Sequence, residues 1–284
     1  MTVAAVDRCL TLIEVLAGEP DGLDLGAIAE RIGIPASATH RTLSTLLARG
    51  YVAQDPATQA YSLSLRLALL AFRDLDARHL PDLAQGVLDR LAQRTGEYCR
   101  LSVVEGEGLA WIARAQGATA GLRYEPDMGQ EVVLHTTATG KAWLATLLEN
   151  TALRIACARG LDSGPALGPR RLRSVDELRR HLAETRDRGY AIAEEEGEPG
   201  TVALACVFRA DESSNAPVAG TLSVAGPIIR LSPGRYPEIA EALREAAAAM
   251  ASLWPLRKRQ LQRLPRANGV RSSARSVNNL GALA

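Results

Sequence analysis

The sequence predicts an α+β protein of two domains, a small helical one followed by a larger one built on a mainly antiparallel sheet. Three observations support this prediction. Residues 1–66 show helical periods and then two short alternating runs, residues 67–80 form one connecting helical segment, and residues 81–255 alternate between helix and strand patterns. Residues 256–284 hold seven basic residues, no acidic ones and few large apolar ones, which predicts a disordered tail.

The composition is that of a globular protein with room for two cores. The chain has 284 residues, of which 47% are hydrophobic and 23% charged, and its net charge is +1. No run approaches the roughly 18 apolar residues of a membrane span. The four cysteines lie far apart without zinc-ligand spacing, so we expect reduced thiols in a cytoplasmic protein, no metal site and no cofactor.

The first domain begins with an amphipathic helix over residues 5–17, which carries charges unlike those of a signal peptide. The segment LDLGAIAERIGI then forms an apolar stripe that stops at Gly33, a residue suited to the left-handed conformation that ends a helix. The small side chain of Ala29 lets the next helix approach closely. YVAQDPATQAYSLS places a turn signal between two alternating runs. Two helices joined by a tight turn and followed by a hairpin predict a winged helix-turn-helix.

The second helix of this motif has two different faces. In GIPASATHRTLSTLLARGYV, the inner face carries Thr39, Leu43, Leu46 and Leu47. The outer face has small hydrogen-bonding residues, one Arg and no Glu, unlike the Glu/Lys mixture of an ordinary solvated helix. Such a face can enter a major groove about 12 Å wide. We therefore predict DNA contacts from the outer face and the wing: Ser37, His40, Arg41, Ser44, Thr45, Thr58 and Gln59.

The charge of the first domain limits how it can bind DNA. Residues 1–66 contain five Arg against seven Asp or Glu, so the domain is not a basic patch. We expect binding to depend on dimerisation and on contacts placed at the groove. A helical hairpin in some other class of protein is the alternative interpretation.

The second domain combines helices with strands that look antiparallel. The connecting helix is expected to end before Pro81, and YCRLSVVEGEGLAWIARA indicates a hairpin around residues 105–108. Ser174 and Glu177 predict a capping box for a helix that stops at Gly189. VALACVFRAD and PVAGTLSVAG are predicted strands, and YPEIAEALREAAAAMASLW is the last predicted helix.

Four ordered segments resemble the IclR family of bacterial transcription regulators. They are LGAIAERIGIPASATHRTLSTLLARGYV, MGQEVVLHTTATGKAWLATLL, RGYAIAEEEGEPGTVALACVFRAD and AGTLSVAGPIIRL. The resemblance implies a GAF-like α/β effector-binding domain after the winged helix-turn-helix, and a repressor or activator that binds double-stranded operator DNA. It also implies a homodimer or homotetramer, and a small organic or aromatic acid as the effector.

The resemblance places one part of the effector site at a helix start, at Ala138, Thr139 and Gly140. Backbone N–H groups at a helix start suit a carboxylate. The segment HTTATGKA is not a phosphate loop, because that motif needs Gly at the position of His135 and Ser or Thr after Lys141. We therefore expect a carboxylic acid and exclude a nucleotide.

The remaining effector positions have lost polar groups relative to the members that bind small oxo-acids. Those members have an Asp at the position of Ala193 or Glu194, and a Cys at that of Val202 to within one residue. Of their Ser-x-Ser strand this chain keeps Ser223 but has Ala225. Because each missing partner costs a polar ligand roughly 1–3 kcal/mol, the resemblance favours an effector with an apolar body, an aromatic acid.

Trp111, Tyr124 and Leu134 are candidates to line such a pocket, and an ordinary place in the core of the sheet is the alternative. His181 lies on a charged helix and is expected to be solvated. The run of residues 194–196 is expected to be a surface turn apart from Glu194.

There are two alternatives to a ligand-responsive regulator. A thiol enzyme built on Cys99 and His135 lacks an Asn or Asp to orient the imidazole, and the resemblance places His135 on a strand. We therefore predict no catalytic residue and no enzyme, with a small-molecule hydrolase or transferase fused to the winged helix as the alternative. A DNA binder whose second domain is blind to ligands is the other alternative.

Overall fold

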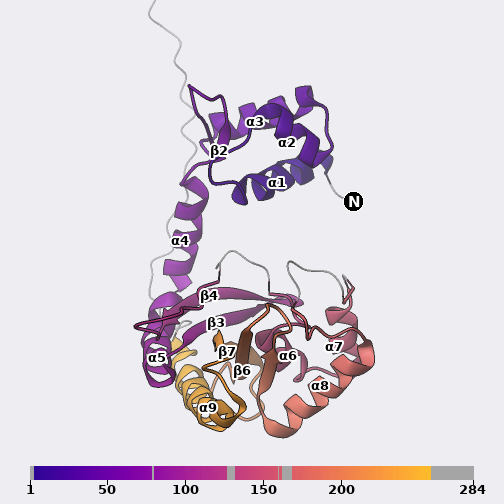
Figure 1. Ribbon diagram of the computed structural model, residues 1–284. Coiled ribbons are helices and arrows are strands. Elements are labelled where there is room, and N and C mark those ends of the chain that lie inside the picture. The colour runs from indigo at the N-terminus through magenta and orange to yellow at the C-terminus, as the bar shows by residue number, and fades with distance from the viewer. Residues whose placement is uncertain (1–2, 79, 127–131, 159, 162–167, 257–284) are drawn as a thin grey trace, which may run out of the picture. The chain divides into compact units, whose positions relative to one another are not determined.

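The computed structural model describes residues 3–78, 80–126, 132–158, 160–161 and 168–256. It divides into two units, residues 1–79 and 80–284, each with its own apolar core (Figure 1). The predicted tail lies outside the described residues, apart from Leu256. No helix within the described ranges is long and apolar enough to cross a membrane.

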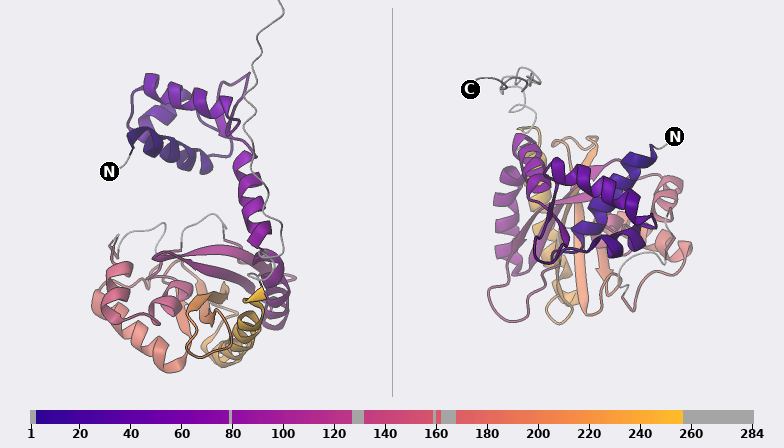
Figure 2. Two further views of the ribbon diagram at one scale, coloured as in Figure 1. Left: turned by 180° about the vertical axis from the view of Figure 1, so that it is seen from behind. Right: turned by 90° about the horizontal axis from the view of Figure 1, so that it is seen from above.

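The first unit has the order helix, helix, helix, hairpin, helix. Its elements are α1 (Ala4–Ala17), α2 (Leu25–Ile32), α3 (Ala36–Ala48), β1 (Val52–Gln54), β2 (Tyr61–Leu63) and α4 (Arg66–Arg78). The two strands pair antiparallel, with Val52 opposite Leu63. This is the winged helix-turn-helix that the sequence predicts, seen from behind in Figure 2.

Local signals set the bounds of the second helix. The carboxylate of Asp24 accepts a hydrogen bond from the backbone N–H of Ala27 at 2.8 Å, so α2 begins there. It ends at Gly33, whose φ of 64° is the left-handed conformation predicted for it. The helices and the hairpin close over one core, which consists of Leu12, Leu16, Ile28, Leu43, Leu46, Val52 and Tyr61.

The second unit is a five-stranded sheet with helices on both faces. Its helices are α5 (Leu80–Thr95), α6 (Ala138–Leu144), α7 (Glu149–Ala156), α8 (Val175–Arg188) and α9 (Tyr236–Leu253), with a short 3₁₀ turn at Pro233–Arg235. Its strands are β3 (Tyr98–Glu105), β4 (Gly108–Gln116), β5 (Ala191–Glu194), β6 (Thr201–Arg209) and β7 (Val218–Pro227). The strand order is β4-β3-β7-β6-β5 and every neighbouring pair is antiparallel, which confirms the predicted α+β class.

Alternation along the strands decides which side chains meet which helices. Val202 and Leu204 of β6 point to the face covered by α5 and α9 and belong to the larger core. Their neighbour Ala205 packs with Ala138 and Ala142 of α6 on the opposite face. The face covered by α6 is therefore the one with the smaller side chains.

Boundaries predicted from local signals are confirmed. The capping box of Ser174 and Glu177 opens α8, and Gly189 ends it with a φ of 78°. The prediction that His135 lies on a strand is wrong, because His135 is buried in the turn before α6. There its Nε2 lies 2.9 Å from the carbonyl oxygen of Leu161.

Candidate functional site

The first candidate site is the outer face of α3. Ser37, His40, Arg41, Ser44 and Thr45 are all exposed there, as predicted. The hydroxyl of Ser44 donates to the carbonyl of His40 at 2.8 Å, and that of Thr45 to the carbonyl of Arg41 at 3.0 Å. The helix therefore already uses these two hydroxyl protons, and Arg41 is the long cation left to reach DNA. The DNA contacts themselves remain predictions.

The tip of the wing is a turn organised by Asp55. Its carboxylate accepts hydrogen bonds from the backbone N–H groups of Ala57 and Thr58, both at 2.8 Å, and these bonds lower the pKa of Asp55. Gln59 has a φ of 61°, and its side-chain amide donates to the carbonyl of Pro56 at 3.0 Å. Thr58 and Gln59 are both exposed, but the Gln59 amide serves the turn.

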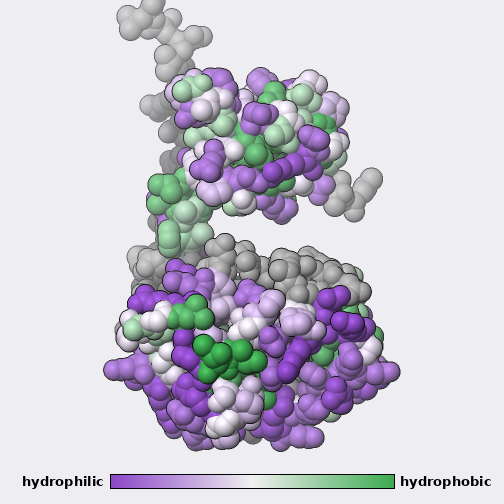
Figure 3. All heavy atoms as spheres, in the orientation of Figure 1, coloured by the Kyte–Doolittle hydropathy of each residue, from purple (hydrophilic) through white to green (hydrophobic). Residues whose placement is uncertain are grey.

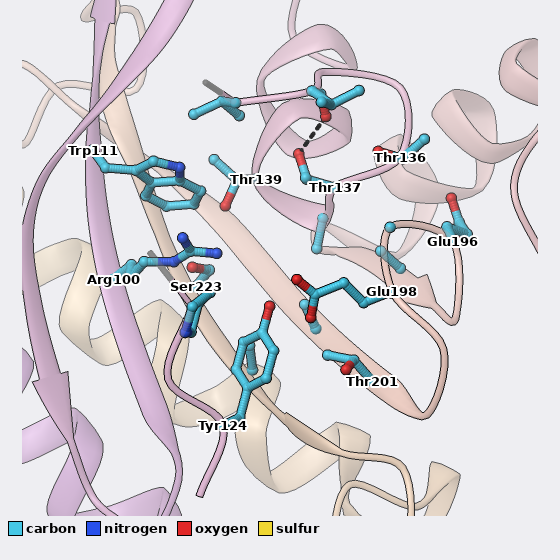
Figure 4. Close-up of a pocket in the computed structure, with 18 residues that line it drawn as sticks. Arg100, Trp111, Tyr124, Thr136, Thr137, Thr139, Glu196, Glu198, Thr201 and Ser223 are labelled. Carbon is cyan, nitrogen blue, oxygen red and sulfur yellow. Dashed lines mark hydrogen bonds between the residues drawn. The ribbon is translucent and has the colours of Figure 1, made fainter. Parts of the chain in front are cut away.

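The second candidate site is a cavity of about 160 Å³ on the α6 face of the sheet (Figure 4). It is lined by residues of all five strands of the sheet, of the start of α6 and of the loops beside them. The lining residues that matter below are Arg100, Trp111, Tyr124, Ala138, Thr139, Ala193, Glu198, Ala203, Ser223 and Ala225. Of the proposed lining residues, Trp111 and Tyr124 are therefore present, whereas Leu134 packs in a neighbouring core cluster.

Strand register gives this cavity a floor of alanines. Ala193 of β5 lies opposite Ala203 of β6, and Ala203 lies opposite Ala225 of β7. Directly opposite residues share a face of the sheet, so three methyl groups form one row beneath the cavity. A row of methyl groups offers no hydrogen bond and leaves space for a flat apolar group.

Three of the residues predicted to bind the effector lie outside the lining of this cavity. Val202 is fully buried on the face of α5 and α9, one residue away from Ala203, because a shift of one position along a strand reverses the face. Glu194 pairs with Val202 and carries an ion pair to Arg170 outside the cavity. Gly140 does not line the cavity. A Cβ there would lie 2.3 Å from the backbone of Leu134, so Gly140 serves close packing.

Arg100 is the residue that sequence reasoning missed. It lies on β3 opposite Ser223, and its guanidinium carbon is 3.7 Å from the centroid of the Trp111 ring. In the described part of the chain Arg100 forms no ion pair, although the charge of Glu198 acts on it, and its buried Nε has no hydrogen-bond partner. Burial lowers its pKa, although an Arg remains protonated. The signal in the sequence was an Arg within the apolar strand YCRLSVV.

Across the cavity from Arg100 are Tyr124 and Glu198. Figure 4 shows the guanidinium of Arg100, the hydroxyl of Tyr124 and the carboxylate of Glu198 directed into the same space. Burial and the nearby charge of Glu198 raise the pKa of Tyr124, so its hydroxyl is protonated. The cavity thus has a cationic side, an acidic side and apolar surfaces between them.

A buried ion pair closes the wall behind the cavity. Nζ of Lys141 lies 2.6 Å from each carboxylate oxygen of Glu196 and 3.2 Å from Nδ1 of His181. A charged Lys only donates, so Nδ1 accepts and His181 is neutral. Burial, and then the charge of Lys141, lowers the pKa of His181 to about 4. The predictions of a solvated His181 and of Glu196 in a surface turn were wrong, because Lys141 draws both inward.

The start of α6 has the free N–H groups that were predicted for it. The hydroxyl of Thr137 accepts from the N–H of Gly140 at 3.0 Å and caps the helix. Within the described residues, the N–H groups of Ala138 and Thr139 have no hydrogen-bond partner, and both residues line the cavity. A ligand oxygen can therefore reach them.

The thiol chemistry considered from the sequence has no support in the geometry. Cys99 is fully buried on the α5 face, and burial raises its pKa to about 12. A thiol with such a pKa is not a thiolate near neutral pH. Within the described residues, no group of three His, Cys, Asp or Glu side chains could hold a metal ion.

Comparison with known proteins finds two family models that match successive parts of the chain. The model of the IclR helix-turn-helix domain matches residues 5–56, and that of the bacterial transcriptional regulator IclR C-terminal matches residues 72–252. The HTH-type transcriptional regulator BhcR of Paracoccus denitrificans is 30% identical over 261 residues, which are 88% of this chain and 86% of that protein. The transcriptional repressor IclR of Escherichia coli is 29% identical over 247 residues, 86% of this chain and 88% of that protein.

A solved structure agrees in fold. The crystal structure of an IclR transcriptional regulator from Alicyclobacillus acidocaldarius superposes with a TM-score of 0.74 at 27% identity, covering 89% of this chain and all of that one (100%). The matched models and relatives are transcription regulators and not enzymes. A winged helix-turn-helix joined to a sheet domain with a ligand-sized cavity, matched over nearly its whole length, places this chain in the IclR family of DNA-binding bacterial transcription regulators.

Proposed function

We propose that the second unit binds a small carboxylic acid with an aromatic body, and that this binding changes the affinity of the winged helix-turn-helix for operator DNA. The observation that carries the proposal is the cavity of about 160 Å³ on the α6 face. Its floor is the row of Ala193, Ala203 and Ala225, and the ring of Trp111 forms a wall. Such a site suits a flat apolar group with a few polar contacts at its ends.

The same surfaces disfavour the smallest oxo-acids as effectors. Glyoxylate and pyruvate carry a carbonyl oxygen directly beside the carboxylate, and three methyl groups cannot pair with that oxygen. The free N–H groups of Ala138 and Thr139, together with Ser223 and Arg100, are the groups available to bind one carboxylate. An open cavity with polar groups at its rim also favours a sensor over a second domain blind to ligands.

On the DNA side, we propose that a homodimer or homotetramer places two or more α3 helices in successive major grooves of a double-stranded operator in the cytoplasm. A single winged helix with five Arg and seven acidic residues in positions 1–66 has few phosphate contacts of its own. Two copies double those contacts.

The test is calorimetry of the full chain with glyoxylate, pyruvate, benzoate and substituted benzoates, followed by fluorescence anisotropy on DNA. The DNA would be selected from random sequences with the protein itself. We expect at least one benzoate to bind and to shift the DNA titration, while glyoxylate and pyruvate do neither. Tight binding of glyoxylate with no aromatic acid bound would overturn the proposal.

A further inference from the structure

Arg100 forms no ion pair in the described part of the chain, and the charge of Glu198 acts on it only from a distance. The Trp111 ring covers one flat side of the guanidinium at 3.7 Å, and the ring of Tyr98 lies 5.6 Å from it. Aromatic rings stabilise a cation through its flat side but leave the N–H groups at its edge unpaired. The buried Nε of Arg100 is one such group without a partner. A planar anion with two oxygens matches the geometry of this edge.

The carboxylate of Glu198 accepts hydrogen bonds, whereas the guanidinium of Arg100 donates them. Glu198 follows β5 in the turn to β6, is partly buried and lines the cavity. Within the described residues it forms no ion pair with Arg100, although both face the same space (Figure 4). A carboxylate only accepts hydrogen bonds, so the part of a ligand that reaches Glu198 must donate one. A second carboxylate there would be repelled.

Between these two side chains the cavity is apolar. The alanine row of β5, β6 and β7 lies below, and Trp111 stands beside Arg100. The hydroxyl of Tyr124 lies on the acidic side and donates to Glu198, whose carboxylate can accept a further hydrogen bond from a ligand. Along the cavity, an anion-binding group is therefore followed by an apolar slot and then by a hydrogen-bond acceptor.

We propose that Arg100 and Glu198 determine effector specificity, and that together they select a hydroxyaryl carboxylate with its carboxylate on Arg100 and its hydroxyl donating to Glu198. This inference rests on the proposed function, since it assigns the residues that read the two ends of the aromatic acid. The carboxylate also lies beside Ser223, which is directly opposite Arg100 in the strand register.

The ligands for the test are benzoate, 4-hydroxybenzoate, 2-hydroxybenzoate and 4-methoxybenzoate, titrated calorimetrically into the full chain without DNA. We expect 4-hydroxybenzoate to bind about tenfold or more tightly than benzoate, because a hydrogen bond to a charged acceptor is gained. The 4-methoxy compound has the same oxygen without a proton, and the 2-hydroxy compound has its hydroxyl at the wrong end. Both are expected to bind no more tightly than benzoate.

Substitutions of Glu198 and Arg100 test the two ends of the ligand separately. Glu198→Met should remove the advantage of the 4-hydroxyl group and leave the affinity for benzoate within about twofold. Arg100→Met should weaken both acids by about tenfold or more, and Arg100→Lys, which keeps the charge but loses the fork, should give an intermediate loss. Circular dichroism checks folding, and Arg100→Lys serves if the Met variant does not fold.

Matched controls use exposed residues that lie away from the cavity. Arg90→Met removes a charge on α5, which covers the opposite face of the sheet, and Glu105→Met removes one at the end of β3. Neither residue lines the cavity, so neither change should alter the affinity for either acid.

Three results would overturn the inference. They are equal affinities of the wild-type chain for 4-hydroxybenzoate and 4-methoxybenzoate, unchanged affinities in both Arg100 variants, or tighter benzoate binding by Glu198→Met with no effect of the hydroxyl group. The last result would make Glu198 a competitor of the ligand for Arg100. Acid binding that follows the expected pattern but leaves DNA affinity unchanged would instead count against the regulatory proposal alone.

Discussion

The charged amine of Lys141 is buried on the α6 face of the sheet. The side chain of Lys141 is 0% exposed, and that of its partner Glu196 is 4% exposed. Removing one partner of such a pair leaves the other charge buried and unpaired. We therefore expect Lys141→Met to lower the free energy of unfolding by about 3–5 kcal/mol, and the double variant Lys141→Met with Glu196→Leu to recover much of that loss. Urea unfolding followed by circular dichroism measures both.

The control for this prediction is an ion pair at the surface. Arg154 and Glu107 form one whose side chains are 59% and 64% exposed. Such pairs contribute about 0–1 kcal/mol, so Arg154→Met should cost far less than Lys141→Met. Equal losses from the two variants would mean that the Lys141 pair is solvated after all.

His181 makes the stability of the second unit depend on pH. Its pKa in the folded chain is lowered to about 4, and an unfolded His titrates near 6.5. Between these values the unfolded chain binds a proton that the folded chain does not. The stability that is present above pH 6.5 is therefore lost as the pH falls toward 4. Glu184, Glu196, Arg180 and Arg188 also face this ring, and they stay in place in the comparison below.

The measurement compares the wild type with His181→Asn at about pH 6.8 and about pH 5.2. The wild type should lose more free energy of unfolding between the two pH values than the variant does. An identical loss in both proteins would show that His181 takes up its proton while the domain is folded.

At the scale of the elements, the recognition helix is the part to test. Arg41 is exposed on α3, where the hydroxyls of Ser44 and Thr45 are bonded to the helix itself. One Arg contact in the major groove is worth about 1–3 kcal/mol, so Arg41→Ala should weaken DNA binding by about that amount. Anisotropy with a DNA site selected by the wild type measures the loss. Arg90→Ala, an exposed change of equal charge on α5, should leave it unchanged.

The elements were predictable where short-range chemistry decides them. The bounds of α2 and α8 follow from Asp24, Gly33, Ser174 and Gly189, all within a few residues of the helix they end. The site was predictable in outline only. Its alanine floor depends on pairings among three strands, and an offset of one residue put Val202 in place of Ala203.

Arg100 and Glu196 show why long-range contacts escape such reasoning. Arg100 has Trp111 as its neighbour only after β3 and β4 pair, and the bulge beside Leu101 brings the two together. In the sequence Glu196 is one of three consecutive acids that cannot be told apart. Only the fold shows that Lys141, distant in the sequence, pairs with it. No local pattern carries either fact.

At the scale of the whole molecule, the first unit leaves two apolar stripes uncovered in the single chain. Val3, Val6 and Leu10 of α1 are 67%, 56% and 55% exposed. Leu69 and Phe72 of α4 are 60% and 67% exposed, and Figure 3 shows the stripe on α4 in green. Such stripes at helical spacing are typical of surfaces that bury themselves against another copy.

We therefore predict an oligomer at micromolar concentration, seen by light scattering. Phe72→Glu should shift it toward monomer, because a charge would be buried in the contact. Leu148→Glu changes a residue that is 82% exposed in the second unit and should have no such effect. A wild-type monomer at this concentration would contradict the prediction.

The burial of Lys141 also has a consequence for amine chemistry. An acylating reagent needs a neutral amine in contact with solvent, and the ε-amine of Lys141 meets that condition only when the α6 face opens. The chain contains one other lysine, Lys258, so a mass shift on the peptide that contains residue 141 has a single origin. The rate at which this mass shift appears therefore measures how often the α6 face opens. No labelling site has to be introduced by mutation. Glu196, which holds the amine, also lines the cavity, so an occupied cavity should slow the acylation of Lys141.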